Sequence, residues 1–327
     1  MRKITLTTAV LMSFAASTID AQEAVRIGTS SVGSTFYILS VGAAEIMNRH
    51  SGIDAAVEPL GGSGPNVFGL ADGTIEMSMI NSFTAQAGYL GSAPYDTPTD
   101  LTLLLQGQPT YRFILVRPDA NIANPRDLEG ATFIGRRRAL PEIELVMNSV
   151  TAAFDLDASA INIIETQTTP EALEAVSVGT VDGLVMPAAR AEQTVMEATM
   201  HGRLEFMPID AEGAARMLEH LPEAFYSQII EASSFPGQDS DVHVVGMNTY
   251  FVARGDLDEE TAYLAVKAIL DNPDEFSTFH AEARYYTVEN TVSTPAAIPF
   301  HPGAIRYLQE VGAWSDAMED RQQALSR

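Results

Sequence analysis

A pattern of strand, small polar turn and helix occurs three times in succession near the start of this chain, and it constrains the fold more than any other feature. The predicted strands lie at 25–27, 55–60 and 75–79, and glycine, serine, threonine or asparagine follows each of them. Strands that alternate with helices predict a parallel sheet, in which the turns gather at the carboxyl ends of the strands. Ligands of open α/β sheets bind along that edge, so these turns are the first candidates for a site.

The first turn runs from Gly28 to Ser34 and leads into a helix that Ser34 or Thr35 is expected to cap. Its hydroxyls and free backbone N–H groups would lie at the positive end of the helix dipole, where an anion such as a carboxylate binds readily. An ordinary strand-to-helix connection is the alternative, and this turn alone does not decide between the two. The same construction at Gly61–Gly64 and Asn81–Ser82 favours a ligand site.

The composition is that of a folded protein with an acidic surface. Hydrophobic residues make up 46% and charged residues 19% of the chain, the formal net charge is −24, and the pI is about 4.4. This excess of acidic residues argues against nucleic acid and anionic membranes as partners, because proteins bind both through Lys and Arg side chains. A small anion stays possible, since local N–H groups can hold it. The chain has no Cys, which removes disulfides, thiolate nucleophiles and a lipid-anchored N-terminal Cys.

The N-terminus has the pattern of a secretory signal peptide, residues 1–21. Arg2 and Lys3 give it a positive start, an apolar stretch follows over 4–16, and Ala21 is the predicted residue before the cut. An N-terminal core helix is the alternative, which the basic start disfavours. No later run approaches the ~18 apolar residues that a membrane span needs. We therefore expect a mature protein that is exported to the periplasm and is not embedded in the membrane.

The second part of the chain repeats the plan of the first. Its predicted elements are strands at 131–134, 161–165 and 181–186 and helices at 142–154, from a cap at Thr169, and at 188–199. The helix-to-strand join Leu70–Glu76 also resembles Val176–Asp182, because in both a Gly is followed by Thr, a β-branched residue and an acid. We infer two lobes built to one plan.

Two extended stretches, 111–117 and 242–252, are predicted to cross between the lobes. A further strand is predicted at 101–105, and 203–241 is expected to be irregular. With two crossings the second lobe is an insertion in the first. The predicted division is lobe I at 22–116 and 245–327 and lobe II at 117–244.

Patterns typical of enzymes and metal sites are missing from the sequence. Ser63 lies in Gly-Gly-Ser-Gly-Pro, where Pro65 stands in place of the glycine that a GxSxG nucleophile elbow needs. The six His residues show no HxxxH or HExxH spacing, and the chain has no Walker A or GxGxxG run. His301 is expected to be a structural residue at the start of a helix. We therefore expect no enzyme activity, no cofactor and no metal.

Three consecutive arginines, 136–138, are unusual in so acidic a chain. They lie in the predicted turn after the first strand of lobe II, and the fork of an arginine suits a carboxylate or a phosphate. A solvated loop that pairs with surface acids is the alternative, and the sequence leaves both open. We expect one or two of them, with Arg136 and Arg137 as the candidates, to reach a ligand.

Four segments together resemble the TAXI family of TRAP-transporter solute receptors, over essentially the whole mature chain. They are IGTSSVGSTFY at 27–37, Gly61–Gly62–Ser63, Asn81–Ser82 and FHPGAIRYLQEVG at 300–312. The resemblance implies a type II periplasmic-binding-protein fold, with two α/β lobes, a hinge and a ligand cleft between the lobes. It places the ligand contacts on Ser31, Thr35, Tyr37, Gly62, Ser63, Asn81 and Ser82.

The same resemblance implies binding without chemistry. The protein would capture a small organic anion, such as an amino acid, a dicarboxylate or a 2-oxo acid, and deliver it to a TRAP permease driven by an ion gradient. Glutamate, glutamine and 2-oxoglutarate are ligands in the family, and we expect a monomer. A ligand-sensing receptor for a membrane sensor protein is the alternative, and a periplasmic enzyme on the same scaffold is less favoured.

Four departures from the family pattern concern the ligand. Ser30 replaces a glycine, Phe83 an aspartate, Arg136–Leu140 a GSGT-like loop and Pro187–Arg190 a GxP segment. We therefore expect lobe II to close on a ligand different from the family's amino acids. The additional arginines indicate additional negative charge, such as that of a dicarboxylate.

Overall fold

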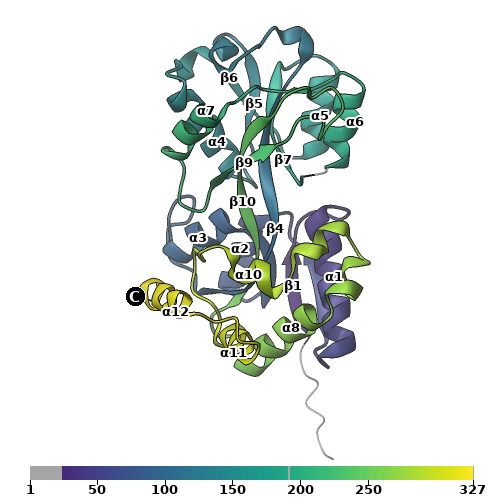
Figure 1. Ribbon diagram of the computed structural model, residues 1–327, viewed down its shortest axis with the longest axis vertical. Helices are drawn as coiled ribbons and strands as arrows, with labels where there is room; N and C mark the ends of the chain where they lie inside the picture. The colour runs from purple at the N-terminus through teal and green to yellow at the C-terminus, as the bar shows by residue number, and fades with distance from the viewer. Residues whose placement is uncertain (1–23, 191, 327) are drawn as a thin grey trace, which may run out of the picture.

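The protein has two lobes that are joined by two long central strands (Figure 1). The computed structural model describes residues 24–190 and 192–326, and the predicted signal peptide at 1–21 lies outside them. Within these ranges, none of the helices is both long enough and apolar enough to cross a membrane.

A single sheet runs through both lobes. Its strands are β1 (Val25–Thr29), β2 (Ala55–Pro59), β3 (Met77–Asn81), β4 (Leu101–Val116), β5 (Thr132–Arg136), β6 (Asn162–Glu165), β7 (Gly183–Ala188), β8 (Glu205–Phe206), β9 (Tyr226–Ile230) and β10 (Val242–Arg254). Their order is β2–β1–β3–β10–β4–β7–β5–β6, with β8 on β4 and β9 on β10.

The predicted parallel strands form two groups. β1 is parallel to β2 and β3, β5 is parallel to β6 and β7, and the long strands β4 and β10 are antiparallel to their neighbours. β3 ends at Asn81, opposite Thr249 of β10, and β7 ends at Ala188, opposite Tyr111 of β4. The carboxyl ends of both groups therefore face the boundary between the lobes.

Helices cover both faces of this sheet (Figure 1). They are α1 (Thr35–His50), α2 (Ser63–Asp72), α3 (Ser82–Leu90), α4 (Glu142–Ala153), α5 (Thr169–Ser177), α6 (Gln193–Met200), α7 (Ala211–Leu218), α8 (Glu259–Asp271), α9 (Pro273–Ser277), α10 (Val288–Ser293), α11 (Pro302–Glu310) and α12 (Asp316–Leu325). Short 3-10 helices lie at Pro118–Ala120, Pro125–Leu128, Ala158–Ala160 and Ala281–Tyr285. Ser34 caps α1 as predicted, whereas α5 is capped by Thr168, one residue before the predicted cap.

The central strands differ from the prediction. β4 is one strand of 16 residues, where we predicted two at 101–105 and 111–117, because Pro109 does not end it. Pro109 lies opposite Asn248, and the register between the two strands shifts just beyond this pair. Such an irregularity is one of the few places in a sheet that tolerates a residue without an N–H. The stretch 203–241, predicted to be irregular, contains β8, α7 and β9.

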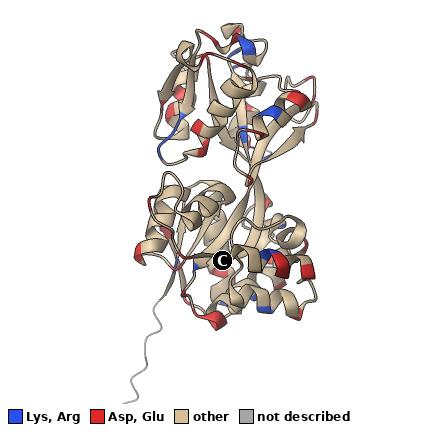
Figure 2. Ribbon diagram, turned by 90° about the vertical axis from the view of Figure 1, so that its left-hand side faces the viewer, with Lys and Arg blue, Asp and Glu red and all other residues tan. Residues whose placement is uncertain are grey.

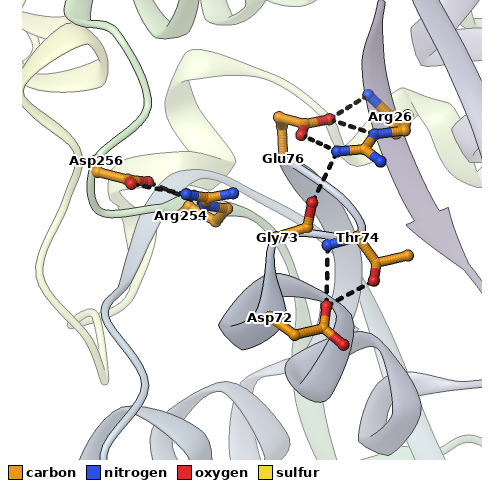
Figure 3. A network of polar contacts seen from close by, with 7 residues as sticks. All are labelled: Arg26, Asp72, Gly73, Thr74, Glu76, Arg254 and Asp256. Carbon is orange, nitrogen blue, oxygen red and sulfur yellow. Dashed lines mark hydrogen bonds and ion pairs between the residues drawn. The ribbon is translucent and has the colours of Figure 1, made fainter.

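The helix-to-strand join of lobe I lies away from the boundary between the lobes. Gly73 ends α2 in the left-handed region, with a φ of 78°. Glu76 binds the guanidinium of Arg26, and Arg254 pairs with Asp256 at 2.7 Å (Figure 3). The backbone N–H of Arg254 donates to the carbonyl of Glu76 at 3.0 Å, so the end of β10 closes the join.

The join of lobe II repeats this construction. Gly179 follows α5 with a φ of 75°, and the backbone N–H of Arg117 donates to the carbonyl of Asp182 at 2.8 Å. Arg117 pairs with Asp119 at 2.6 Å. In each lobe a long central strand leads to an arginine that closes the join and is held by an aspartate two residues later. The sequence likeness of the two joins therefore corresponds to one shared construction.

Candidate ligand-binding site

The turns after β2 and β3 come together at the boundary between the lobes. Ser63 begins α2 and Asn81 ends β3, and both are buried. The backbone N–H of Asn81 donates to the Ser63 hydroxyl at 3.2 Å, and its side-chain oxygen caps α3 by accepting from the backbone N–H of Thr84 at 2.7 Å. A Cβ on Gly62 would lie 3.6 Å from the carbonyl of Ala139, in the loop before α4. Three predicted ligand residues thus lie at the starts of two helices, where an anion is favoured.

A carboxylate from lobe II already occupies this place. Glu142 is the first residue of α4 and is fully buried. Its Oε1 accepts from the side-chain amide of Asn81 at 3.2 Å and forms an ion pair with Arg112, which is also buried. Arg112 belongs to β4, where it donates to the Thr110 hydroxyl and the Tyr111 carbonyl. One carboxylate therefore links lobe I, lobe II and a strand that passes through both.

Several buried polar atoms in this region of the described structure have no hydrogen-bond partner. They are Oε2 of Glu142, Nε of Arg112, the hydroxyl of Tyr95 and the hydroxyl of Thr249, a residue that lies opposite Asn81 in the sheet. Burial, and then the nearby Glu142 carboxylate, raise the pKa of Tyr95, so its phenol stays protonated as a donor. An unpartnered polar atom is costly when buried, so water or ligand groups that reach this cluster gain hydrogen bonds.

Further contacts join the lobes on the same side of the sheet. The Ser82 hydroxyl donates to the carbonyl of Ala224 at 3.4 Å. The ring centroids of the next residue in each segment, Phe83 and Phe225, lie 5.7 Å apart. Phe83, which replaces the aspartate of the TAXI pattern, therefore contributes an apolar contact between the lobes.

The turn after β1 lies differently from the turns after β2 and β3. Ser31 is exposed, Val32 is 70% exposed, and Thr35 and Tyr37 are half-buried. Within 24–190 and 192–326, no side-chain hydrogen bond joins Ser31, Thr35 or Tyr37 to lobe II. Their ligand contacts stay predictions, and the turn is accessible to a solute.

The arginine run is bound within lobe II. Arg136 is exposed and pairs with Glu144 of α4 at 2.7 Å. Arg137 is half-buried, donates to the carbonyl of Gln167 at 3.1 Å and to the Thr169 hydroxyl at 2.9 Å, and has its pKa lowered by burial. Both guanidinium groups thus have partners in their own lobe, and a contact with ligand stays a prediction for each.

The loop after β7 reaches the opposite face of β4. Arg190 donates to the carbonyl of Ile229 at 3.3 Å, and burial raises the pKa of Tyr111 while the positive charge of Arg190 opposes this rise. Glu282, in the segment before α10, is 4% exposed, and burial raises its pKa. The segment Pro187–Arg190, which departs from the TAXI pattern, therefore contacts one of the two strands that join the lobes.

Sequence reasoning missed Glu142 and Arg112. The sequence does carry an indication for Arg112, which is a charge inside the apolar run YRFILVR, because a buried charge requires a partner. It carries none for Glu142, since an acid in the first turn of a helix is also favoured on a solvated surface.

The fold is shared with periplasmic binding proteins of known structure. The binding protein component of an ABC phosphonate transporter from Pseudomonas aeruginosa superposes with a TM-score of 0.57 at 10% identity, over 93% of this chain and 96% of that one. MatC from Rhodopseudomonas palustris with bound malate gives 0.52 at 14% identity, over 92% and 98%. The periplasmic aliphatic sulphonate binding protein SsuA from Escherichia coli gives 0.50 at 14% identity, over 93% and 85%. The class is therefore the two-lobed type II periplasmic-binding-protein fold, as predicted.

The family follows from the sequence. The model of the NMT1-like family matches residues 27–312, and the chain belongs to this family. Family and fold together are those of periplasmic substrate-binding proteins. Membership of the TAXI receptors in particular stays a prediction.

Proposed function

We propose that this protein is an extracytoplasmic solute receptor that closes its two lobes on a small organic anion in the periplasm. The observation that carries the proposal is the Glu142 carboxylate held by Asn81 beside Ser63. It marks a buried place at two helix N-termini with the donors that a carboxylate needs. The unpartnered Nε of Arg112 and the Tyr95 hydroxyl supply further donors. The role is binding, with no reaction on the ligand.

The ligands named for proteins of the same fold support an anion. One neighbour belongs to a phosphonate transporter, one binds aliphatic sulphonates and one holds malate. The bound malate favours a dicarboxylate among the predicted classes. The negative surface does not oppose this, because acidic residues are spread over both lobes (Figure 2) and salt screens a diffuse field beyond about 8 Å.

Binding is coupled to movement of the lobes through β4 and β10. Both strands pass from one lobe to the other, so a change in their twist near Thr110 and Asn248 turns one lobe against the other. A ligand that contacts Ser31 and Thr35 in lobe I and the arginine run in lobe II makes both sets of contacts only in the closed form. It stabilises that form by its difference in affinity for the two states.

As the membrane partner we propose a TRAP permease driven by an ion gradient. The TAXI-like motifs at 27–37 and 300–312 support this partner, whereas the phosphonate relative belongs to an ABC transporter. Uptake of labelled ligand into vesicles that contain the permease separates the two mechanisms. Uptake that requires an inward sodium gradient supports a TRAP permease, and uptake that requires ATP contradicts it.

The proposed ligand class is tested by identifying the ligand. Small molecules released from the purified protein are identified by mass spectrometry. The Tm of the protein is then measured as malate, succinate, glutamate or 2-oxoglutarate is added. We expect one of them to raise the Tm as its concentration passes Kd. Thr35→Ala combined with Asn81→Ala should weaken the binding of that ligand. Ser159→Ala, on an exposed turn of lobe II, should leave its affinity unchanged. Unchanged affinity in the double variant would place the ligand elsewhere.

A further inference from the structure

We propose that Glu142 is a built-in competitor of the ligand: its carboxylate takes the anion place of lobe I and latches the two lobes together when no solute is bound. The latch does not depend on which ligand the protein binds. The competition rests on the proposed function, since it requires an acidic ligand.

The latch is the hydrogen bond from Asn81 in lobe I to Glu142 in lobe II. Arg112, the second partner of Glu142, pairs with Pro187 of β7 in the sheet. It therefore moves with lobe II, although the division predicted from the sequence assigned residues 22–116 to lobe I. Opening of the lobes then breaks the 3.2 Å bond between Asn81 and Glu142 and leaves the ion pair with Arg112 intact.

Asn81 is fixed so that it offers a donor to this boundary. Its side-chain oxygen accepts from the backbone N–H of Thr84 at 2.7 Å and caps α3. Its NH₂ group therefore points away from the helix, toward the Ser63 hydroxyl at 3.4 Å and Oε1 of Glu142 at 3.2 Å. A group that binds here must accept a hydrogen bond from Asn81, and a carboxylate is the strongest acceptor among protein side chains.

The latch can be displaced because it is incomplete. Oε2 of Glu142 and Nε of Arg112 are buried without partners among the described residues. A ligand carboxylate that enters the open cleft can take the Asn81 donor and bring further polar groups to these atoms. Only the open fraction accepts the ligand, so the latch lowers the apparent affinity by that fraction.

Distance measurements on the ligand-free protein test the latch. The chain has no Cys, so Leu90→Cys in lobe I and Val178→Cys in lobe II, 56% and 61% exposed, carry a unique pair of spin labels. We expect a shift to longer distances in Glu142→Ala. The control Glu144→Gln, which changes a partly exposed acid of the same helix, should keep the distance of the parent.

Glu142→Gln keeps the size of the side chain and one acceptor oxygen, and it serves if the alanine variant does not fold. The distance between its labels should also increase, because the acceptor has lost its charge, but by less than in Glu142→Ala, because one acceptor oxygen stays. Distances that stay at the parent value in the folded Glu142 variant overturn the latch. The latch is also overturned if the labels in the ligand-free parent protein are already as far apart as in the Glu142 variants.

Titration calorimetry with L-malate and with 2-oxoglutarate tests the competition. We expect Glu142→Ala to bind the accepted probe about tenfold more tightly than the parent, which corresponds to one charged hydrogen bond. The control for binding is Asn148→Ala, at an exposed position of the same helix, which should bind as the parent does. Weaker binding in Glu142→Ala makes Glu142 a ligand contact and overturns the competition. If neither probe binds any variant while the labels still move apart, the latch stands and the organic-anion ligand is overturned.

Discussion

The two lobes share a construction at their outer ends and differ where they meet. At the outer ends, Gly73 and Gly179 turn a helix into a strand with φ values of 78° and 75°, and an Arg–Asp pair closes each join. At the boundary, lobe I offers donors from Asn81 and its neighbours, whereas lobe II offers the carboxylate of Glu142.

This difference separates the residues that hold a lobe from those that recognise the other lobe. The outer ends have the same construction in both lobes, so equivalent substitutions there should lower the free energy of unfolding by similar amounts. The boundary has no such symmetry, because a hydrogen-bond donor in lobe I binds an acceptor in lobe II. Substitutions there should have effects that the opposite lobe does not reproduce.

Arg112→Met is expected to have the largest effect, because it leaves the buried carboxylate of Glu142 without its cation. Removing one member of a buried ion pair costs about 3–5 kcal/mol, to be measured by urea denaturation. Arg112→Met combined with Glu142→Leu removes both charges and should recover most of that loss. Arg136→Met, which breaks an exposed pair, is the matched control and should change little. An equally small loss for Arg112→Met would contradict the central role of this pair.

Gly73→Ala and Gly179→Ala test the likeness of the outer ends. Each should lower the free energy of unfolding by about 1–2 kcal/mol, since both glycines have left-handed backbone conformations. The loss should be slightly larger at Gly73, whose added Cβ would lie 2.7 Å from the Arg254 guanidinium, against 3.1 Å from that of Arg117 at Gly179. Gly52→Ala, with a φ of 73° and no atom within 4 Å of its Cβ, measures the backbone cost alone. A clear loss in only one lobe would show that the joins are not equivalent.

Asn81→Ala and Asp210→Ala compare a helix cap at the boundary with one inside lobe II. Asn81 caps α3 and Asp210 caps α7, so each substitution should lower the free energy of unfolding by about 1 kcal/mol. Only Asn81→Ala removes a contact between the lobes, so only this variant should also change the distance between labels on the two lobes. Equal behaviour of the two variants in that second measurement would reduce Asn81 to a cap.

The smallest expected effects are the pKa shifts of the two aspartates at the outer ends, Asp119 and Asp256, and they should be similar in the two lobes. Hydrogen bonds from Arg117 and Arg254 hold the pKa of Asp119 and Asp256 below the usual range. A carboxyl whose folded pKa is depressed stabilises the protein above its unfolded value of about 3.9, and this contribution is lost as the pH falls through the folded pKa. Carboxyl NMR titration should find both below about 3.9. An ordinary pKa for one of them would break the likeness of the two joins.

The parts of the fold that depend on local sequence were predictable. Alternation of strands and helices indicated the two parallel groups, and of the two predicted caps, Ser34 and Thr35, Ser34 is the one that caps α1. The single long β4 was not, because Pro109 is locally a strand breaker and only its pairing with Asn248 beside a register shift makes it acceptable.

The candidate site was half predictable for a similar reason. Ser63 and Asn81 follow strands whose carboxyl ends must meet in a parallel sheet, so their proximity follows from the alternation alone. Glu142 is 61 residues from Asn81 and 30 from Arg112. These contacts depend on how the second lobe is placed against the first, and no local pattern reports that placement.

The strand order also decides when the chain can finish folding during its synthesis. β3 is complete at Asn81, but its neighbour β10 exists only once residues 242–254 have been made. Until then one side of β3 is an open row of backbone N–H and C=O groups, which pairs readily with other chains. Contacts so distant in sequence also form slowly. A chain truncated before β10 should therefore aggregate, because the last central strand to be made is the one that covers this edge.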